Sequence, residues 1–88
     1  MFFNTIKISG GDGSTKETAI KIQNAKSDAE GVDAEYRYLD KKYPGGWELD
    51  EQTLILDEDR QYDIMAIILP DGSRKEVWFD ITEFYKLE

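Results

Sequence analysis

The sequence predicts an α+β domain in which one main helix packs on an antiparallel sheet, in the order β-β-α-β-β-β with a short C-terminal helical turn. Three observations lead to this fold. One stretch, residues 27–43, has helical periodicity, five other stretches have the patterns of strands, and turn residues separate them. The 88 residues are expected to form a single domain, residues 1–88, because a chain of this length builds one core.

Two short strands are predicted first. Phe3–Ser9 alternates, with Ile6 and Ile8 on one side, which is typical of a half-buried strand. A loop rich in glycine follows, and glycine permits the positive φ angles of turns. Ala19–Gln23 alternates in the same way and predicts the second strand.

The helix has clear start and stop signals. Ser27 and Glu30 have the spacing of a capping box, and Pro44–Gly46 cannot continue a helix. Gly31 weakens the helix by about 1 kcal/mol relative to Ala, and close packing against the sheet is the reason that the sequence offers for it. Apolar residues at helical spacing predict the buried face: Ala29, Val32, Tyr36, Leu39 and Tyr43.

The remaining residues predict a β meander that ends in a helical turn. Its strands are Trp47–Leu56, Gln61–Leu69 and Arg74–Ile81, joined by turns at Asp57–Arg60 and Pro70–Ser73. The middle strand is apolar on both faces, which favours a place at the centre of the sheet. Thr82 is expected to cap the final helical turn over residues 82–87.

Composition excludes much of the common chemistry. The chain carries 11 Lys and Arg against 19 Asp and Glu, a net charge of −8, yet its 40% hydrophobic content is too high for a disordered acidic tail. The absence of Cys removes disulfides, thiolate nucleophiles and Cys-bound metals, and the absence of His removes the usual acid–base residue. We therefore expect a non-enzymatic protein without a cofactor, and an enzyme that uses paired carboxylates is the third hypothesis.

The acidic residues concentrate in residues 47–63, where seven Asp and Glu accompany a single Arg. This stretch has three interpretations. In the first, the stretch is part of an acidic inhibitor that mimics nucleic acid and blocks a DNA- or RNA-binding protein. In the second, it is a solvated edge that protects the hairpin from aggregation. The third is a weak calcium site at Asp57, Glu58, Asp59 and Asp63, although the spacing does not match an EF-hand.

A partner surface is predicted on the face of the sheet that the helix leaves open. Trp78 lies on that face if its neighbours Val77 and Phe79 point to the helix, and Met65 and Ile67 join it there in one of the two possible registers. Trp and Met are enriched at interface centres, so we expect these three side chains to anchor a partner. The alternative is that other parts of the chain cover them.

Asp57, Glu58 and Asp59 are expected to form an acidic rim that steers a basic partner to this surface. The expected partner is another protein, with a homodimer as a further possibility, and the negative charge argues against direct contact with nucleic acid. No signal-peptide pattern occurs, and the longest apolar run, residues 64–69, is too short to span a bilayer. The expected location is therefore the cytoplasm, without membrane contact.

Six short fragments, taken together, resemble a family of small uncharacterised bacterial domains. The fragments are Gly11–Ser14, Ala34–Tyr36 with Leu39, Tyr43–Gly45 with Trp47, Tyr62–Asp63, Asp71–Ser73 and Phe79–Ile81. The resemblance spans most of the chain, from residue 10 to residue 84. It implies a bacterial or phage origin and a compact α+β domain, and it assigns no catalytic residue.

Overall fold

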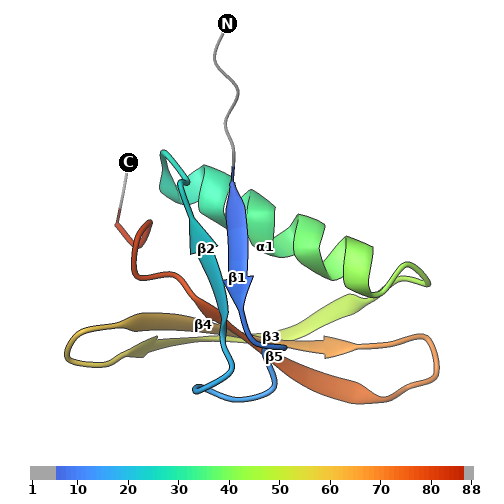
Figure 1. Cartoon of the computed structure of the whole chain (residues 1–88). Helices are drawn as coiled ribbons and strands as arrows, with labels where there is room; N and C mark the ends of the chain where they lie inside the picture. The colour runs from blue at the N-terminus through green and yellow to red at the C-terminus, as the bar shows by residue number, and fades with distance from the viewer. Residues whose placement is uncertain (1–5, 87–88) are drawn as a thin grey trace, which may run out of the picture.

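The computed structural model describes residues 6–86, which form one helix and a five-stranded mixed sheet. The elements along the chain are β1 (Lys7–Gly10), β2 (Ile20–Gln23), α1 (Asp28–Lys42), β3 (Glu48–Leu56), β4 (Gln61–Ile68) and β5 (Arg74–Asp80). Figure 1 shows α1 lying over one face of the sheet, with β1 and β2 running at a steep angle to the other three strands. The predicted α+β class is thus confirmed. The helix α1 lacks the length and the apolar composition needed to cross a membrane.

The strand order is β1-β2-β5-β4-β3, so β1 and β3 are the two edges. The expectation of an antiparallel sheet is wrong at one pairing, because β2 runs parallel to β5 with Ile20 opposite Phe79. The other three pairings are antiparallel. The strand predicted for the centre of the sheet is β4, which is an interior strand, although β5 is the middle one. The predicted first strand began at Phe3, and residues 1–5 lie outside the described part of the chain.

The core lies between α1 and the sheet. Met65 of β4 lies opposite Val77 of β5, and both side chains are buried on the side that carries the helix. The ring of Tyr38 on α1 meets Phe79 edge-on, with 5.7 Å between ring centroids. Residues of β2, β4, β5, α1 and the C-terminal segment fill the core: Ile20, Ile22, Ala34, Leu39, Met65, Ile67, Val77, Phe79, Ile81 and Phe84.

The helix begins where the capping box predicts. Ser27 is the N-cap, and its hydroxyl oxygen accepts a hydrogen bond from the backbone N–H of Glu30 at 3.2 Å. The Glu30 side chain accepts in turn from the backbone N–H of Lys26 at 3.1 Å. The two bonds satisfy N–H groups that would otherwise be unpaired at the helix start.

The predicted buried face of the helix is correct only in part. Leu39 is fully buried, and Val32 and Tyr43 are partly buried and pack against the core. Ala29 and Tyr36, which the apolar pattern placed inside, are exposed. The residues buried on α1 are Gly31, Ala34, Glu35 and Leu39. A pattern based on apolar residues misses part of this face because two of its members are a glycine and a glutamate.

The C-terminal segment, residues 82–86, forms hydrogen-bonded turns, so the predicted final helical turn is not confirmed, and residue 87 lies outside the described part of the chain. The backbone N–H groups of Phe84 and Tyr85 both donate to the carbonyl oxygen of Ile81, at 3.1 and 2.9 Å. Thr82 does not cap a helix. Its hydroxyl oxygen accepts from the backbone N–H of Gln61 at 3.0 Å and so ties the segment to the start of β4.

Phe84 explains the glycine inside the helix. The Phe84 side chain is buried, and a Cβ atom placed on Gly31 would overlap its ring. The glycine therefore lets the ring pack directly on the helix backbone. The sequence suggested close packing against the sheet, whereas the observed contact is with the C-terminal segment.

We predict that Gly31→Ala lowers the free energy of unfolding by about 1–3 kcal/mol, because overpacking at the Phe84 ring outweighs the gain in helix propensity. Chemical denaturation of the variant and the natural chain measures the difference. Gly45→Ala is the matched control, since the nearest atom to its new Cβ would be Pro70 Cγ at 3.9 Å. Equal stability of the Gly31→Ala variant and the natural chain would contradict the packing account.

Candidate functional site

The predicted apolar anchors do not share one face. Trp78 lies on the face away from α1, partly buried, and meets Tyr62 edge-on with 5.9 Å between ring centroids. Met65 and Ile67 lie on the opposite side, fully buried in the core with 0% exposure. The expected patch of these three residues is therefore wrong, because the register pairs Met65 with Val77 on the helix side of the sheet.

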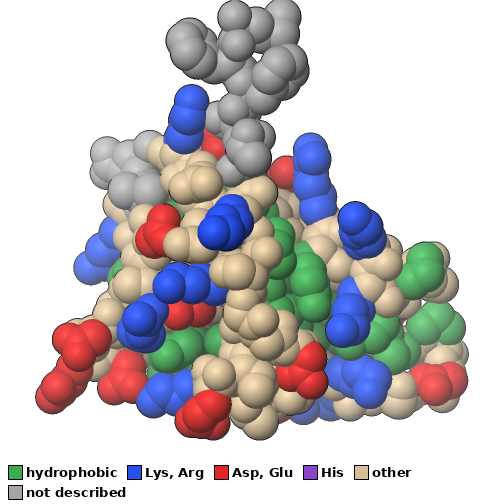
Figure 2. Space-filling model, in the orientation of Figure 1, with side chains coloured by type: hydrophobic (Ala, Val, Ile, Leu, Met, Phe, Trp, Pro, Cys, Tyr) green, Lys and Arg blue, Asp and Glu red, His purple; other side chains and the backbone are tan. Residues whose placement is uncertain are grey.

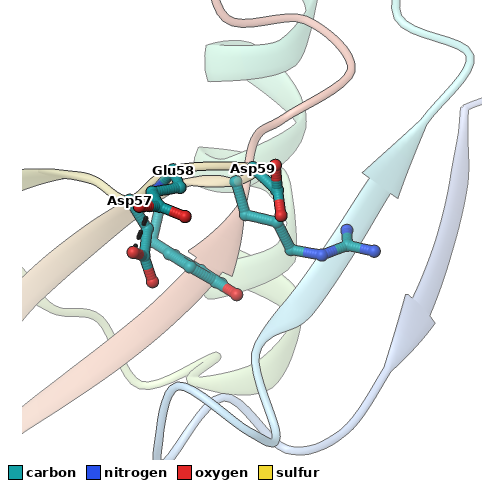
Figure 3. Close-up of a pocket in the computed structure, with 5 residues that line it drawn as sticks. Asp57, Glu58 and Asp59 are labelled. Carbon is teal, nitrogen blue, oxygen red and sulfur yellow. Dashed lines mark hydrogen bonds between the residues drawn. The ribbon is translucent and has the colours of Figure 1, made fainter.

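The predicted acidic rim forms the turn between β3 and β4. Asp57, Glu58 and Asp59 line a shallow hollow of about 250 Å³ together with Arg60 and Tyr62. Figure 3 shows their side chains projecting from the turn in different directions. Asp57 forms an ion pair with Lys16, and the hydrogen bond from Lys16 lowers the pKa of this carboxyl.

The four acids considered as a weak calcium site do not come together. Asp63 is buried on the helix side of β4, away from the solvent-exposed turn of residues 57–59. Within residues 6–86, no group of three acidic side chains is arranged to hold a metal ion. The turn is thus a charged surface feature, and Asp63 does not join its carboxylates.

The most exposed apolar side chains lie on β3, an edge strand of nine residues of which all but Ile55 are exposed. Leu49, Leu54 and Leu56 have 40%, 46% and 61% exposure. All three lie on the side that carries α1. In a regular strand Leu49 and Leu54 would face opposite sides of the sheet, but the register shift between Leu49 and Glu51 adds one residue and returns them to the same side. The chain thus presents a leucine-lined edge that α1 does not cover.

Acidic residues stand at both ends of this edge. Arg74 of β5 binds Asp50 at 3.0 Å and Glu51 at 3.2 Å at one end, while Lys16 binds Asp57 at the other. Three further acids, Glu48, Glu58 and Asp59, form no ion pair with the described residues. The edge therefore keeps negative charge at each end after its own ion pairs are counted.

A second feature is a groove of about 350 Å³ beside the edge strand. The first half of α1, the helix side of β3 and β4, and the C-terminal segment border it, and it is open to solvent. Its walls are partly apolar and partly acidic. The lining residues are Asp28, Val32, Glu35, Gln52, Leu54, Asp63, Ile81, Phe84 and Tyr85.

Glu35 and Asp63 form a buried carboxyl pair in this groove. Glu35 has 1% exposure and Asp63 4%, and Asp63 accepts a hydrogen bond of 2.7 Å from the Gln52 side-chain amide. Burial, then the hydrogen bond to Asp63 and the negative charges of Asp63 and Asp28, raise the pKa of Glu35 to about 10. Glu35 therefore carries a proton at neutral pH and donates it to Asp63.

One oxygen of the pair accepts no hydrogen bond. Glu35 Oε2 is buried, and no N–H or hydroxyl group of the described residues donates to it. Sequence reasoning missed this site, because a glutamate on a helix is normally exposed. The sequence signal that could have revealed its burial is spacing. Glu35 lies four residues after Gly31 and four before Leu39, which places it on the same side of the helix as these two residues.

Comparisons of the chain with protein-family models, curated proteins and solved structures found no match. The resemblance to small bacterial domains therefore stays a prediction. The geometry of the β3 edge and of the groove is what supports the functional inferences.

We predict that the free energy of unfolding falls as pH rises from about 5 to about 9, by about 1 kcal/mol per pH unit. The pKa of Glu35 is about 10 in the folded chain and 4.5 without the fold. Between these values the folded state holds a proton that the unfolded chain has released, so a higher pH favours unfolding. No His is present to titrate in the same range.

Glu35→Gln is expected to remove most of this slope, because the amide keeps the shape of the carboxyl and has no proton to lose. Denaturant titrations at several pH values measure it. Glu17→Gln is the control, since Glu17 is exposed and should leave the slope unchanged. An unchanged slope in Glu35→Gln would show that another group causes the pH dependence.

Proposed function

We propose that this chain is a non-enzymatic binding module that takes up an extended, basic segment of another protein along the edge strand β3. The observation that carries the proposal is the combination on β3 of an open strand edge, exposed leucines and acidic ends. An edge strand directs backbone N–H and C=O groups away from the sheet, and an added strand can pair with them. Leu49, Leu54 and Leu56 supply apolar contacts for the side chains of that strand.

The charge distribution favours a basic partner segment. Glu48 at one end of β3 and Glu58 and Asp59 at the other are acids without an ion pair to the described residues. Lys and Arg at the ends of a bound segment would meet them, which fixes the register and speeds association. Figure 2 shows basic and acidic side chains mixed over the face that carries β1 and β2. Residues 6–26, which include these two strands, hold four Lys against two acidic residues, so this side of the sheet lacks the acidic excess of β3.

Pairing of β3 with β3 of a second copy is unfavourable for the same reason in the register that joins the exposed leucines. In an antiparallel pair centred on Leu54, Glu51 would lie opposite Asp57 of the second copy, and Asp50 opposite its Glu58. Like charges directly opposite each other destabilise a strand pair. In this register the homodimer considered from the sequence is therefore less favoured than a basic heterologous segment.

The nucleic-acid mimic is also less favoured. Such a protein needs acidic side chains that stay free to occupy a nucleic-acid-binding surface. Here Asp50 and Glu51 are bound to Arg74, and Asp57 to Lys16. These ion pairs break up the acidic stretch of residues 47–63 into two short ends around a leucine-lined centre, which suits strand addition better.

Selection from a library of random displayed peptides tests the proposal. We expect the selected peptides to carry Lys or Arg near both ends and strand-forming residues between them, and to shift the NMR signals of β3 amides. Binding should weaken as salt is raised, because screening reduces the attraction of exposed charges. Selection of acidic peptides, contacts centred on Trp78, or no selected peptide at all would contradict strand addition at β3.

Charge variants test the ends of the strand. Glu48→Gln with Glu58→Gln removes one unpaired acid from each end and should weaken a selected peptide by about tenfold, measured by calorimetry. Asp33→Asn with Glu83→Gln is the matched control, because it changes the net charge equally at exposed positions outside β3. Equal weakening by both pairs would show that net charge alone attracts the peptide.

We also predict that the chain stays monomeric at high micromolar concentration and low salt, because of the repulsion between acidic strand ends. Sedimentation equilibrium measures this. A dimer under these conditions would contradict the charge argument against pairing of two β3 strands.

A further inference from the structure

We infer that the groove between α1 and β3 is a binding site for an alkylammonium or alkylguanidinium group, whose positive charge replaces the proton of Glu35. This site lies beside the strand edge of the proposed function and does not depend on strand addition.

The unsatisfied oxygen of Glu35 points to a missing partner. Glu35 lines the groove and is 1% exposed, and its Oε2 atom accepts no hydrogen bond. A buried polar atom without a partner is costly, and native structures normally satisfy such atoms. If the pair with Asp63 served folding alone, a neutral glutamine at position 35 would donate the same hydrogen bond without a group that can ionise.

The surroundings select a cation. Asp63 faces Glu35 from β4, and Asp28 faces it from the start of α1. Gln52 on β3 is neutral, and its amide already donates to Asp63. Tyr85 of the C-terminal segment also lines the groove. No Lys or Arg lines it, so the acidic groups have no internal counter-ion among its lining residues.

The walls select an organic cation with an alkyl chain. Val32, Leu54, Ile81 and Phe84 supply apolar surface along the groove. The volume of about 350 Å³ is at the lower end of the range of small-molecule sites. A divalent metal does not suit it, because no three acidic groups within residues 6–86 are arranged to hold one. An alkyl stem along the apolar wall with its charged head at Glu35 matches both parts of the lining.

Binding involves an exchange of charge. The cation enters, the proton of the Glu35 carboxyl passes to solvent, and the resulting carboxylate pairs with the cation. The total charge in the groove is therefore unchanged. Because one proton is released for each cation bound, affinity should rise about tenfold per pH unit below the pKa of Glu35.

NMR titration with n-butylguanidinium at several pH values tests this inference. We expect shifts at Glu35, Leu54 and Phe84, tighter binding at higher pH, and no binding of uncharged n-pentanol. Glu35→Gln should weaken binding at least tenfold and abolish the pH dependence, while Glu48→Gln, on β3 but outside the groove, should change neither. Binding that is independent of pH, or unaffected by Glu35→Gln, would overturn the inference.

A second pair of variants distinguishes the loss of a contact in the groove from a general effect on folding. Leu54→Ala removes an apolar wall and should weaken n-butylguanidinium binding several-fold. Leu56→Ala is the matched control, because Leu56 lies on the same side of β3 and does not line the groove. Equal effects of the two variants would contradict binding in the groove.

The cation has two possible sources, a free small molecule or a basic side chain of a partner. A tripeptide with arginine between two valines, blocked at both ends, represents the second. Tighter binding of the tripeptide than of n-butylguanidinium indicates a partner side chain, and equal or weaker binding indicates a free small molecule. Failure of both probes to bind overturns the inference and leaves strand addition at β3 to its own test.

Discussion

The packing of the Phe84 ring on the backbone of Gly31 sets the position of the single described helix relative to the sheet. Phe84 belongs to a segment that Thr82 ties to the first residue of β4, so the ring links α1 to the sheet near the N-terminal end of the helix. One helical turn further along, Glu35 faces β4 and meets Asp63. The burial of the carboxyl pair therefore follows from the same contact that closes the core. A side chain at position 31 would push the helix outward and expose the pair to water.

A second constraint is that the sheet is wider than the area that one helix covers. The core draws on β2, β4 and β5, and no residue of β3 belongs to it. Five strands at about 4.8 Å spacing are wider than one helix of about 10 Å diameter can cover. The helix side of β3 is therefore left open, and the leucines there stay exposed. The acidic residues and the register shift near Asp50 make this edge a poor template for a second copy, which is how natural sheets limit edge-to-edge association.

Local signals in the sequence located the elements well. Ser27 and Pro44 bracket α1, and strand alternation placed Trp78 opposite the helix-facing residues of its strand. Non-local features were not predictable. The parallel pairing of β2 with β5 depends on how the chain crosses over the sheet. A strand that is apolar on both faces, as around Met65 and Ile67, gives no indication of which face meets the helix. Glu35 was missed because its burial depends on Asp63, which is distant in sequence and supplies the hydrogen bond that a protonated carboxyl needs.

The edge strand and the groove meet at Leu54, which is exposed on β3 and lines the groove. A segment bound along β3 would therefore lie next to the carboxyl pair. By linkage, any ligand that lowers the proton affinity of Glu35 must itself bind more weakly as the solution becomes more acidic. A basic segment satisfies this condition if one of its side chains reaches the groove. The chain has no histidine, so such coupling would come from a carboxyl whose pKa the fold has raised far above its ordinary value.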